Sequence, residues 1–163
     1  MAIKDDIEDR MADTLLAGAA FASLAMLTIG YLYQVPLAYF PLCEVTIVAE
    51  QAVMERTGLI IRHLSGTIRF DVITASLLTT TANPRKVIVP SYRQVSAYVN
   101  AAIQLFKMQV NRDLGGLTGP TWAVRHIEIG DNAEYGLDSR IQENSYENYG
   151  AVPFVVEIQE AKA

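Results

Sequence analysis

The residue types that most often carry chemistry are scarce and scattered in this sequence. It contains two histidines, His63 and His126, and one cysteine, Cys43. Glu128 lies two residues after His126, so on a strand the two side chains would share a face and could form an ion pair. A zinc site needs at least three protein ligands, and no third ligand follows at a suitable spacing. We therefore predict no metal site and interpret His126 as a half-exposed strand residue.

Motifs for nucleophilic catalysis or phosphate binding are also absent from the sequence. Residues 115–119, Gly-Gly-Leu-Thr-Gly, follow an expected helix, whereas a phosphate-binding loop precedes its helix. Asp131 and Glu134 form a carboxylate pair, but nothing implies the burial that would tune them for acid–base catalysis. Cys43 lies in an alternating apolar run, which indicates a small buried side chain. The sequence predicts no enzyme, no catalytic residue and no cofactor, and an enzyme of unrecognised type is the alternative.

The length and net charge of the chain further limit its possible domain organisation and partners. The 163 residues suit a single domain covering the whole chain. The net charge is −5, and the densest basic group is the pair Arg85 and Lys86. Because Lys and Arg supply most of the affinity for nucleic acids, we do not expect direct DNA or RNA binding. The single cysteine excludes an internal disulfide and suits a reducing cytosol.

An uncharged stretch at residues 14–43 is long enough to span a bilayer. Acidic residues flank it, and few Lys or Arg residues lie beside it to set a membrane orientation. Polar and helix-breaking residues also interrupt it, namely Gly18, Ser23, Thr28, Gly30, Gln34, Pro36 and Pro41. We expect a soluble protein without a membrane span, and a single-pass membrane protein is the alternative.

Two helices are predicted from the spacing of apolar residues. In the first, Ile7, Met11 and Leu15 recur every fourth residue, and the helix should end near Ser23. The second should start with a capping box of Ser91 and Gln94. Its apolar stripe comprises Val95, Val99, Ala102, Phe106 and Val110.

Alternating apolar and polar residues predict a mostly antiparallel sheet. The expected strands cover residues 27–33, 43–50, 59–64, 67–74, 121–129 and 152–158. Residues 65–66 should separate two strand segments, residues 79–86 should form a surface loop, and Trp122 should lie in the core. The fold class is therefore α+β, a mostly antiparallel sheet with an N-terminal helix and one long central helix packed on it.

Residues 130–150 are polar and rich in tyrosine, which predicts a long loop. Loops of this length are usually functional or disordered. Because aromatic residues and arginine are enriched at interfaces, the candidate interface residues are Tyr135, Arg140, Tyr146 and Tyr149. For the tyrosines, ordinary packing within the subunit is the alternative. We expect this loop to be mobile in an isolated subunit and to become ordered against a neighbour.

Five segments together carry a resemblance to a known family. They are residues 40–45 (Phe-Pro-Leu-Cys-Glu-Val), the strand at 68–72, the helix from Ser91, the turn at 130–135 and the closing strand at 149–158. Their order resembles the tail terminator (tail completion) proteins of long-tailed bacteriophages, and the resemblance covers most of the chain.

This resemblance implies a structural virion protein that forms a ring, expected to be a homohexamer. The ring would cap the tail tube, end its polymerisation and join the tail to the head or neck. The implied partners are the tail tube protein and head or neck connector proteins, with DNA passing through the ring without sequence-specific binding and no contact with a membrane. Assembly would take place in the host cytoplasm. Another head–tail connector or neck subunit is the alternative within this class.

Overall fold

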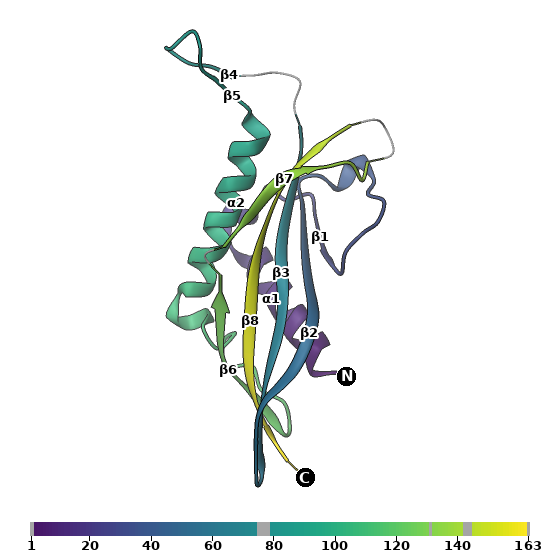
Figure 1. Cartoon of the computed structure of the whole chain (residues 1–163), viewed down its shortest axis with the longest axis vertical. Helices are drawn as coiled ribbons and strands as arrows, with labels where there is room; N and C mark the ends of the chain where they lie inside the picture. Colours follow the sequence, from purple (N-terminus) through teal and green to yellow (C-terminus); the bar gives the residue numbers. More distant parts are fainter. Residues whose placement is uncertain (1, 75–78, 131, 142–144, 163) are drawn as a thin grey trace.

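The computed structural model describes residues 2–74, 79–130, 132–141 and 145–162. One six-stranded sheet runs in the order β1-β2-β3-β8-β6, and β7 pairs with the other end of β8 (Figure 1). Every pairing is antiparallel except that of β1 with β2. The strands are β1 (Met26–Ile29), β2 (Leu42–Arg56), β3 (Leu59–Ile73), β6 (Trp122–Ile129), β7 (Glu134–Asp138) and β8 (Glu147–Ala161). The predicted α+β fold class is confirmed.

Two helices, α1 (Ile3–Ala17) and α2 (Pro90–Lys107), pack on one face of this sheet and share a single apolar core with it. The expected side chains of α1, Ile7, Met11 and Leu15, are fully buried. The helix ends earlier than predicted, because Gly18 is extended and the following 3-10 turn, Ala19–Phe21, carries Phe21 into a stack on Phe70. Neither described helix is both long and apolar enough to cross a membrane.

The central helix confirms most of its predicted stripe. Val95, Val99, Ala102 and Phe106 are buried. The prediction of a capping box was wrong. Ser91 lies inside the helix, where its hydroxyl accepts a hydrogen bond from Asn148 Nδ2 at 2.6 Å. Val110 is exposed, because α2 ends at Lys107 and a 3-10 turn follows.

The hairpin of β2 and β3 is longer than predicted. Both strands have 15 residues, and the turn between them lies at residues 57–58. Gly66, expected to interrupt a strand, instead lies within β3 opposite the register shift in β2 between Ile47 and Ala49. A Cβ atom at Gly66 would clash with the carbonyl oxygen of Thr46, so glycine permits the close approach of the two backbones. Trp122 lies in the core, as expected.

The prediction that residues 130–150 form a long loop was wrong. Its described part contains β7 and the beginning of β8, which pair in register from Glu134 with Ala151 to Asp138 with Glu147. The polar side chains Glu147 and Asn148 are buried inside the protein, so a buried strand has the composition of a loop. Asp131 lies outside the described residues.

Two further segments differ from expectation. The first strand ends at Ile29, because Gly30 has a φ of 100° and turns the chain away from the sheet. Residues 79–86, expected to be a loop, begin with β4 (Thr79–Thr80), which pairs with β5 (Val87–Ile88) in a small ladder of its own.

Candidate functional site

Arg140, one of the predicted interface residues, lies inside the protein. Its guanidinium group contacts three carboxylates that the sheet presents on the face opposite the helices: Nη1 is 2.7 Å from Glu44 Oε1, Nη2 is 3.0 Å from Asp71 Oδ2, and Nε is 3.0 Å from Glu147 Oε1. Only 4% of the Arg140 side chain is exposed. The three carboxylates come from β2, β3 and β8, so the sheet pairing brings them together.

Arg69 on β3 extends this group into a cluster. It donates two hydrogen bonds to Asp71, from Nε to Oδ1 at 2.8 Å and from Nη2 to Oδ2 at 2.9 Å. Its Nη2 also donates to Asp138 Oδ2 at 2.7 Å. Asp71 therefore serves both arginines. We call these six residues, Arg69, Arg140, Glu44, Asp71, Asp138 and Glu147, the arginine cluster.

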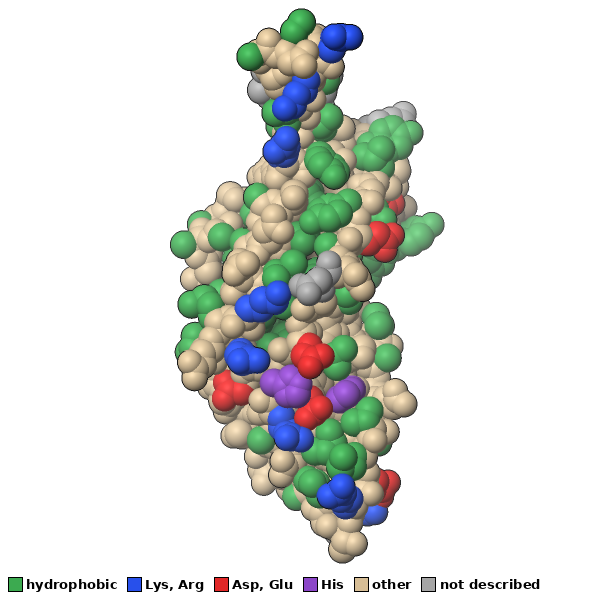
Figure 2. Space-filling view, turned by 60° about the vertical axis from the view of Figure 1, so that its left-hand side comes forward, with side chains coloured by type: hydrophobic (Ala, Val, Ile, Leu, Met, Phe, Trp, Pro, Cys, Tyr) green, Lys and Arg blue, Asp and Glu red, His purple; other side chains and the backbone are tan. Residues whose placement is uncertain are grey.

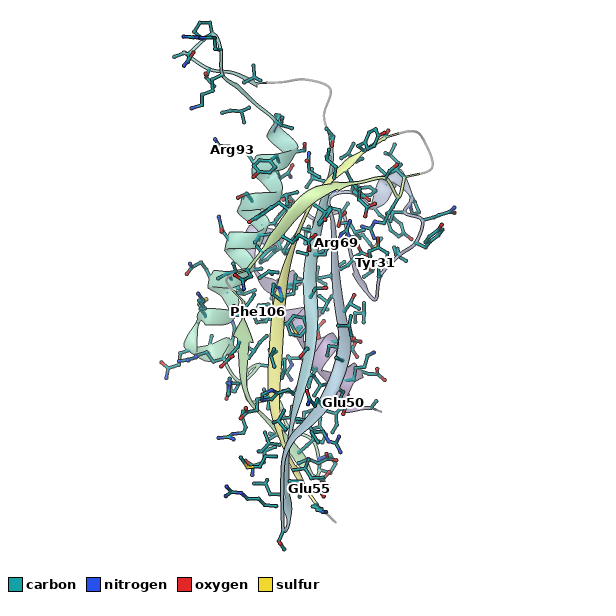
Figure 3. The ribbon with its side chains drawn as sticks, viewed as in Figure 1. Tyr31, Glu50, Glu55, Arg69, Arg93 and Phe106 are labelled. Atoms are coloured by element: carbon teal, nitrogen blue, oxygen red, sulfur yellow. The ribbon has the colours of Figure 1, made fainter. Side chains whose placement is uncertain are left out.

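Two tyrosine rings lie against the arginine cluster. The ring centre of Tyr149 is 4.1 Å from the guanidinium carbon of Arg69, and that of Tyr31 is 4.5 Å from the guanidinium carbon of Arg140. These are cation–π distances. Figure 3 shows Tyr31 beside Arg69 at the end of the sheet.

The same cluster fastens a loop to the sheet. The backbone N–H of Leu32 donates to Glu44 Oε2 at 2.8 Å, and Arg140 Nη1 donates to the Leu32 carbonyl oxygen at 2.9 Å. Val35 N–H donates to the carbonyl oxygen of Arg140 at 3.0 Å. The segments at residues 30–35 and 138–141 are thus held together over the strands.

Burial sets the titration of this cluster. It raises the pKa of Glu44 and of Glu147, and the nearby arginines offset this only in part. Burial alone would lower the pKa of Arg140, but its contacts with Asp71, Glu147 and Glu44 outweigh that effect and raise it. Four carboxyl groups share two guanidinium groups. Among the described residues, the buried Glu147 Oε2 has no hydrogen-bond partner, and Glu44 Oε1 and Arg140 Nη2 make ion-pair contacts without hydrogen-bond geometry. These contacts hold strands β2, β3 and β8 to the segment that carries Arg140.

The predicted interface residues thus fall into different places. Arg140 and Arg69 share Asp71, and the ring of Tyr149 lies against Arg69. The Tyr149 hydroxyl donates to Glu134 Oε1 at 3.1 Å. Tyr135 is exposed on the other side of β7, where its ring centre is 6.1 Å from that of Tyr92 on α2. Tyr146 is also exposed, just before β8. Arg140 is buried within its own chain, so its side chain is not presented to a partner.

Exposed tyrosines surround this end of the sheet. Five of the eight tyrosines are exposed, and we call them the tyrosine set: Tyr31, Tyr33, Tyr92, Tyr135 and Tyr146. Tyr33 is the most open, at 86%. Tyr31 and Tyr33 also line a groove of about 290 Å³ together with Asp138 and Ser139. Tyr31 and Tyr33 were not among the predicted interface residues, because their alternation with Leu32 is typical of a strand.

A second polar cluster lies farther down the sheet, where Figure 2 shows both histidines beside acidic and basic side chains. The predicted pair of His126 and Glu128 is present, with 3.5 Å between Nε2 and Oε1. His63 Nε2 lies 2.9 Å from Glu157 Oε2, and this hydrogen bond is the main reason why the pKa of Glu157 is lowered. Within the described part of the chain, no three His, Cys, Asp or Glu side chains are grouped so that they could hold a metal ion.

Comparison with known proteins finds no protein family model and no curated protein that matches this chain.

Proposed function

We propose that this protein is a structural assembly subunit that forms a ring, caps a phage tail tube, ends tube polymerisation and joins the tail to the head or neck. The observation that carries the proposal is the tyrosine set, five exposed tyrosines at the end of the molecule that holds the arginine cluster. Tyrosine is one of the residues that dominate the binding energy of interfaces, because it buries a large area at a low cost in entropy.

The arginine cluster supports this interpretation by fixing the segment that carries two of the tyrosines. Tyr31 and Tyr33 lie in a loop whose backbone is bonded to Glu44 and Arg140 on either side of Leu32. A surface that is already ordered loses less entropy when it binds a partner. Rigid aromatic side chains on a fastened loop therefore suit a permanent contact between proteins.

The order of the elements supports the identity of the assembly. Strands β2 and β3, helix α2 and strand β8 follow one another in the order on which the resemblance to tail terminator proteins rests. The mechanism in this proposal is shape and charge complementarity between subunits and with the end of the tube. A ring results when a head-to-tail contact closes through rotation. DNA passes through such a ring without being read.

The direct test is a tube-length assay. Tail tube protein polymerised with the wild-type protein should give tubes of limited length with a ring at one end in electron micrographs. The double variant Tyr33→Ser/Tyr146→Ser should give long tubes without a ring, while its thermal midpoint stays close to that of the wild type. Met108→Ser is the matched control, since Met108 is a similarly exposed apolar residue at the far end of α2. Unlimited tubes in the presence of the wild-type protein would contradict the proposal.

A further inference from the structure

The net charge of −5 conceals a strong separation of charge along the chain. Between Asp71 and Asp113 there is no acidic residue, and this stretch holds five of the 13 basic residues, Arg85, Lys86, Arg93, Lys107 and Arg112. All 18 acidic residues therefore lie elsewhere, where they outnumber the remaining eight basic residues.

The outermost of these basic residues form a projection. The ladder of β4 and β5 stands away from the sheet beyond the start of α2 (Figure 1), and Figure 2 shows basic side chains along it without an acidic neighbour. Hydrogen bonds stabilise the turn at its tip. The Arg85 N–H donates to Asn83 Oδ1 at 3.0 Å, and the Thr81 hydroxyl donates to the Lys86 carbonyl oxygen at 3.0 Å. We call residues 79–88 together with Arg93 the basic finger. Exposed Val87 and Tyr92 add apolar area to it.

Helix α1 presents a surface of the opposite kind. Asp5, Asp9, Asp13 and Leu16 are all exposed, and their spacings of four, four and three residues place them in one stripe along the helix. The buried residues Ile7, Met11 and Leu15 occupy the other side of α1. We call the exposed row the acidic stripe. The basic finger projects from one end of the molecule and α1 lies behind the sheet (Figure 1), so the two surfaces are apart within one chain.

We propose that the basic finger of one copy docks on the acidic stripe of the next copy. This contact deepens the proposed ring function and rests on it. A head-to-tail ring needs two different surfaces of one chain that complement each other. Here a basic surface with Val87 and Tyr92 faces an acidic surface with Leu16, so both the charges and the apolar residues match. Opposite charges across an interface also select the partner and its orientation.

A nucleic acid is a weaker candidate for the basic finger. Three cations supply few phosphate contacts, and the molecule as a whole is acidic. A second copy offers the carboxylates at fixed positions on a helix, together with an apolar residue for Val87 or Tyr92 to cover.

The test uses two charge-reversal variants of the full chain. The finger variant is Arg85→Glu/Lys86→Glu/Arg93→Glu, and the stripe variant is Asp5→Lys/Asp9→Lys/Asp13→Lys. All six residues are exposed, so circular dichroism should show folded proteins. We expect the wild type to form a ring by native mass spectrometry and each variant alone to be monomeric. Mixed in equal amounts, the two variants should assemble again, because each then meets a surface of opposite charge.

A second measurement does not depend on charge reversal. The pair Lys86→Cys and Asp9→Cys in one chain should form covalent ladders of several subunits on mild oxidation, since the native Cys43 is buried. Rings formed by the finger variant alone, or the absence of crosslinks in assembled protein, would overturn the contact and leave the ring proposal standing. A wild-type protein that is monomeric both alone and with tail tubes would overturn both. Loss of DNA binding in the finger variant, with its ring intact, would assign the basic finger to nucleic acid instead.

Discussion

Arg140 joins four segments of the chain through one guanidinium group. It contacts carboxylates on β2, β3 and β8 and the Leu32 carbonyl oxygen of the loop after β1. Buried charges of this kind are costly to bring together, but more costly to separate once the fold is built around them. The consequence is that the loop carrying Tyr31 and Tyr33 is fastened to the sheet.

Removal of Arg140 should therefore have a large effect on stability. Arg140→Ala leaves Glu44, Asp71 and Glu147 buried without their shared cation, and breaking a buried ion pair costs about 3–5 kcal/mol. Urea unfolding measures this change. The control is Arg62→Ala, because Arg62 also contacts two carboxylates but is 30% exposed. Exposed pairs contribute about 1 kcal/mol or less, so equal losses at the two positions would contradict the role given to Arg140.

The raised pKa of Glu147 gives a prediction about pH. The pKa of Glu147 in the folded protein lies above the usual value of 4.5. Its protonation therefore stabilises the fold fully below pH 4.5, and this stabilisation is lost as the pH rises through the folded-state pKa. Glu147→Gln lacks this titration. As the pH rises above 4.5, the free energy of unfolding of the wild type should therefore fall relative to that of the variant.

Glu157→Gln is the matched control for this pH series. The pKa of Glu157 is lowered, first by the hydrogen bond with His63, so its contribution is present above the usual value and is lost as the pH falls through the folded pKa. As the pH rises toward 4.5, the free energy of unfolding of this variant should fall relative to that of the wild type. Urea unfolding from pH 3 to pH 8 separates the two cases, and parallel profiles for both variants would refute the assignment.

At the scale of elements, apolar periodicity predicted what the core requires. The stripes of α1 and α2 and the alternation in β2, β6 and β8 are direct consequences of burying one face, so they can be read from single segments. Element ends were predicted less well, since they depend on local contacts. Phe21 ends the region of α1 by stacking in the core, and Asn148 engages the hydroxyl of Ser91 that was expected to cap α2.

The arginine cluster could not be predicted from the sequence. Its carboxylates stand at positions 44, 71 and 147, which become neighbours only through the pairing of β2 with β3 and of β3 with β8. Without that pairing, Glu147 and Arg140 have the composition of a solvated loop. Glu44 and Asp71 occupy polar positions of alternating strand patterns, which is the pattern of a solvent-facing residue.

Gly66 provides a test at this scale. An added methyl group would meet the Thr46 carbonyl oxygen and lie 2.9 Å from the Ile47 Cα, and backbone atoms cannot move aside as a side chain can. Gly66→Ala should destabilise the protein by about 1–3 kcal/mol or more, as overpacked sites do. Ser65→Ala, one residue earlier on the open face, should change the free energy of unfolding little. A neutral Gly66→Ala variant would show that β2 and β3 are not held this closely.

The whole molecule is elongated, with the basic finger at one end and the turn between β2 and β3 at the other (Figure 1). Both helices cover the same face of the sheet, while the segments at residues 30–35 and 138–141 cover part of the opposite face over the arginine cluster. Charge is divided in the same way, with basic residues on the finger and α2 and acidic residues on α1. A subunit with two complementary surfaces suits a head-to-tail assembly, in which one surface of each copy binds a different surface of the next copy.

The mass of the purified full-length protein tests the assembly directly. Native mass spectrometry at low ionic strength should show one closed species of several copies, and a hexamer of the 18.0 kDa chain would have a mass of about 108 kDa. Its mass should stay the same as the protein concentration rises, because a closed ring has no free contact to add further copies. A protein that stays at 18.0 kDa at every concentration, and remains so when tail tubes are added, would contradict the account.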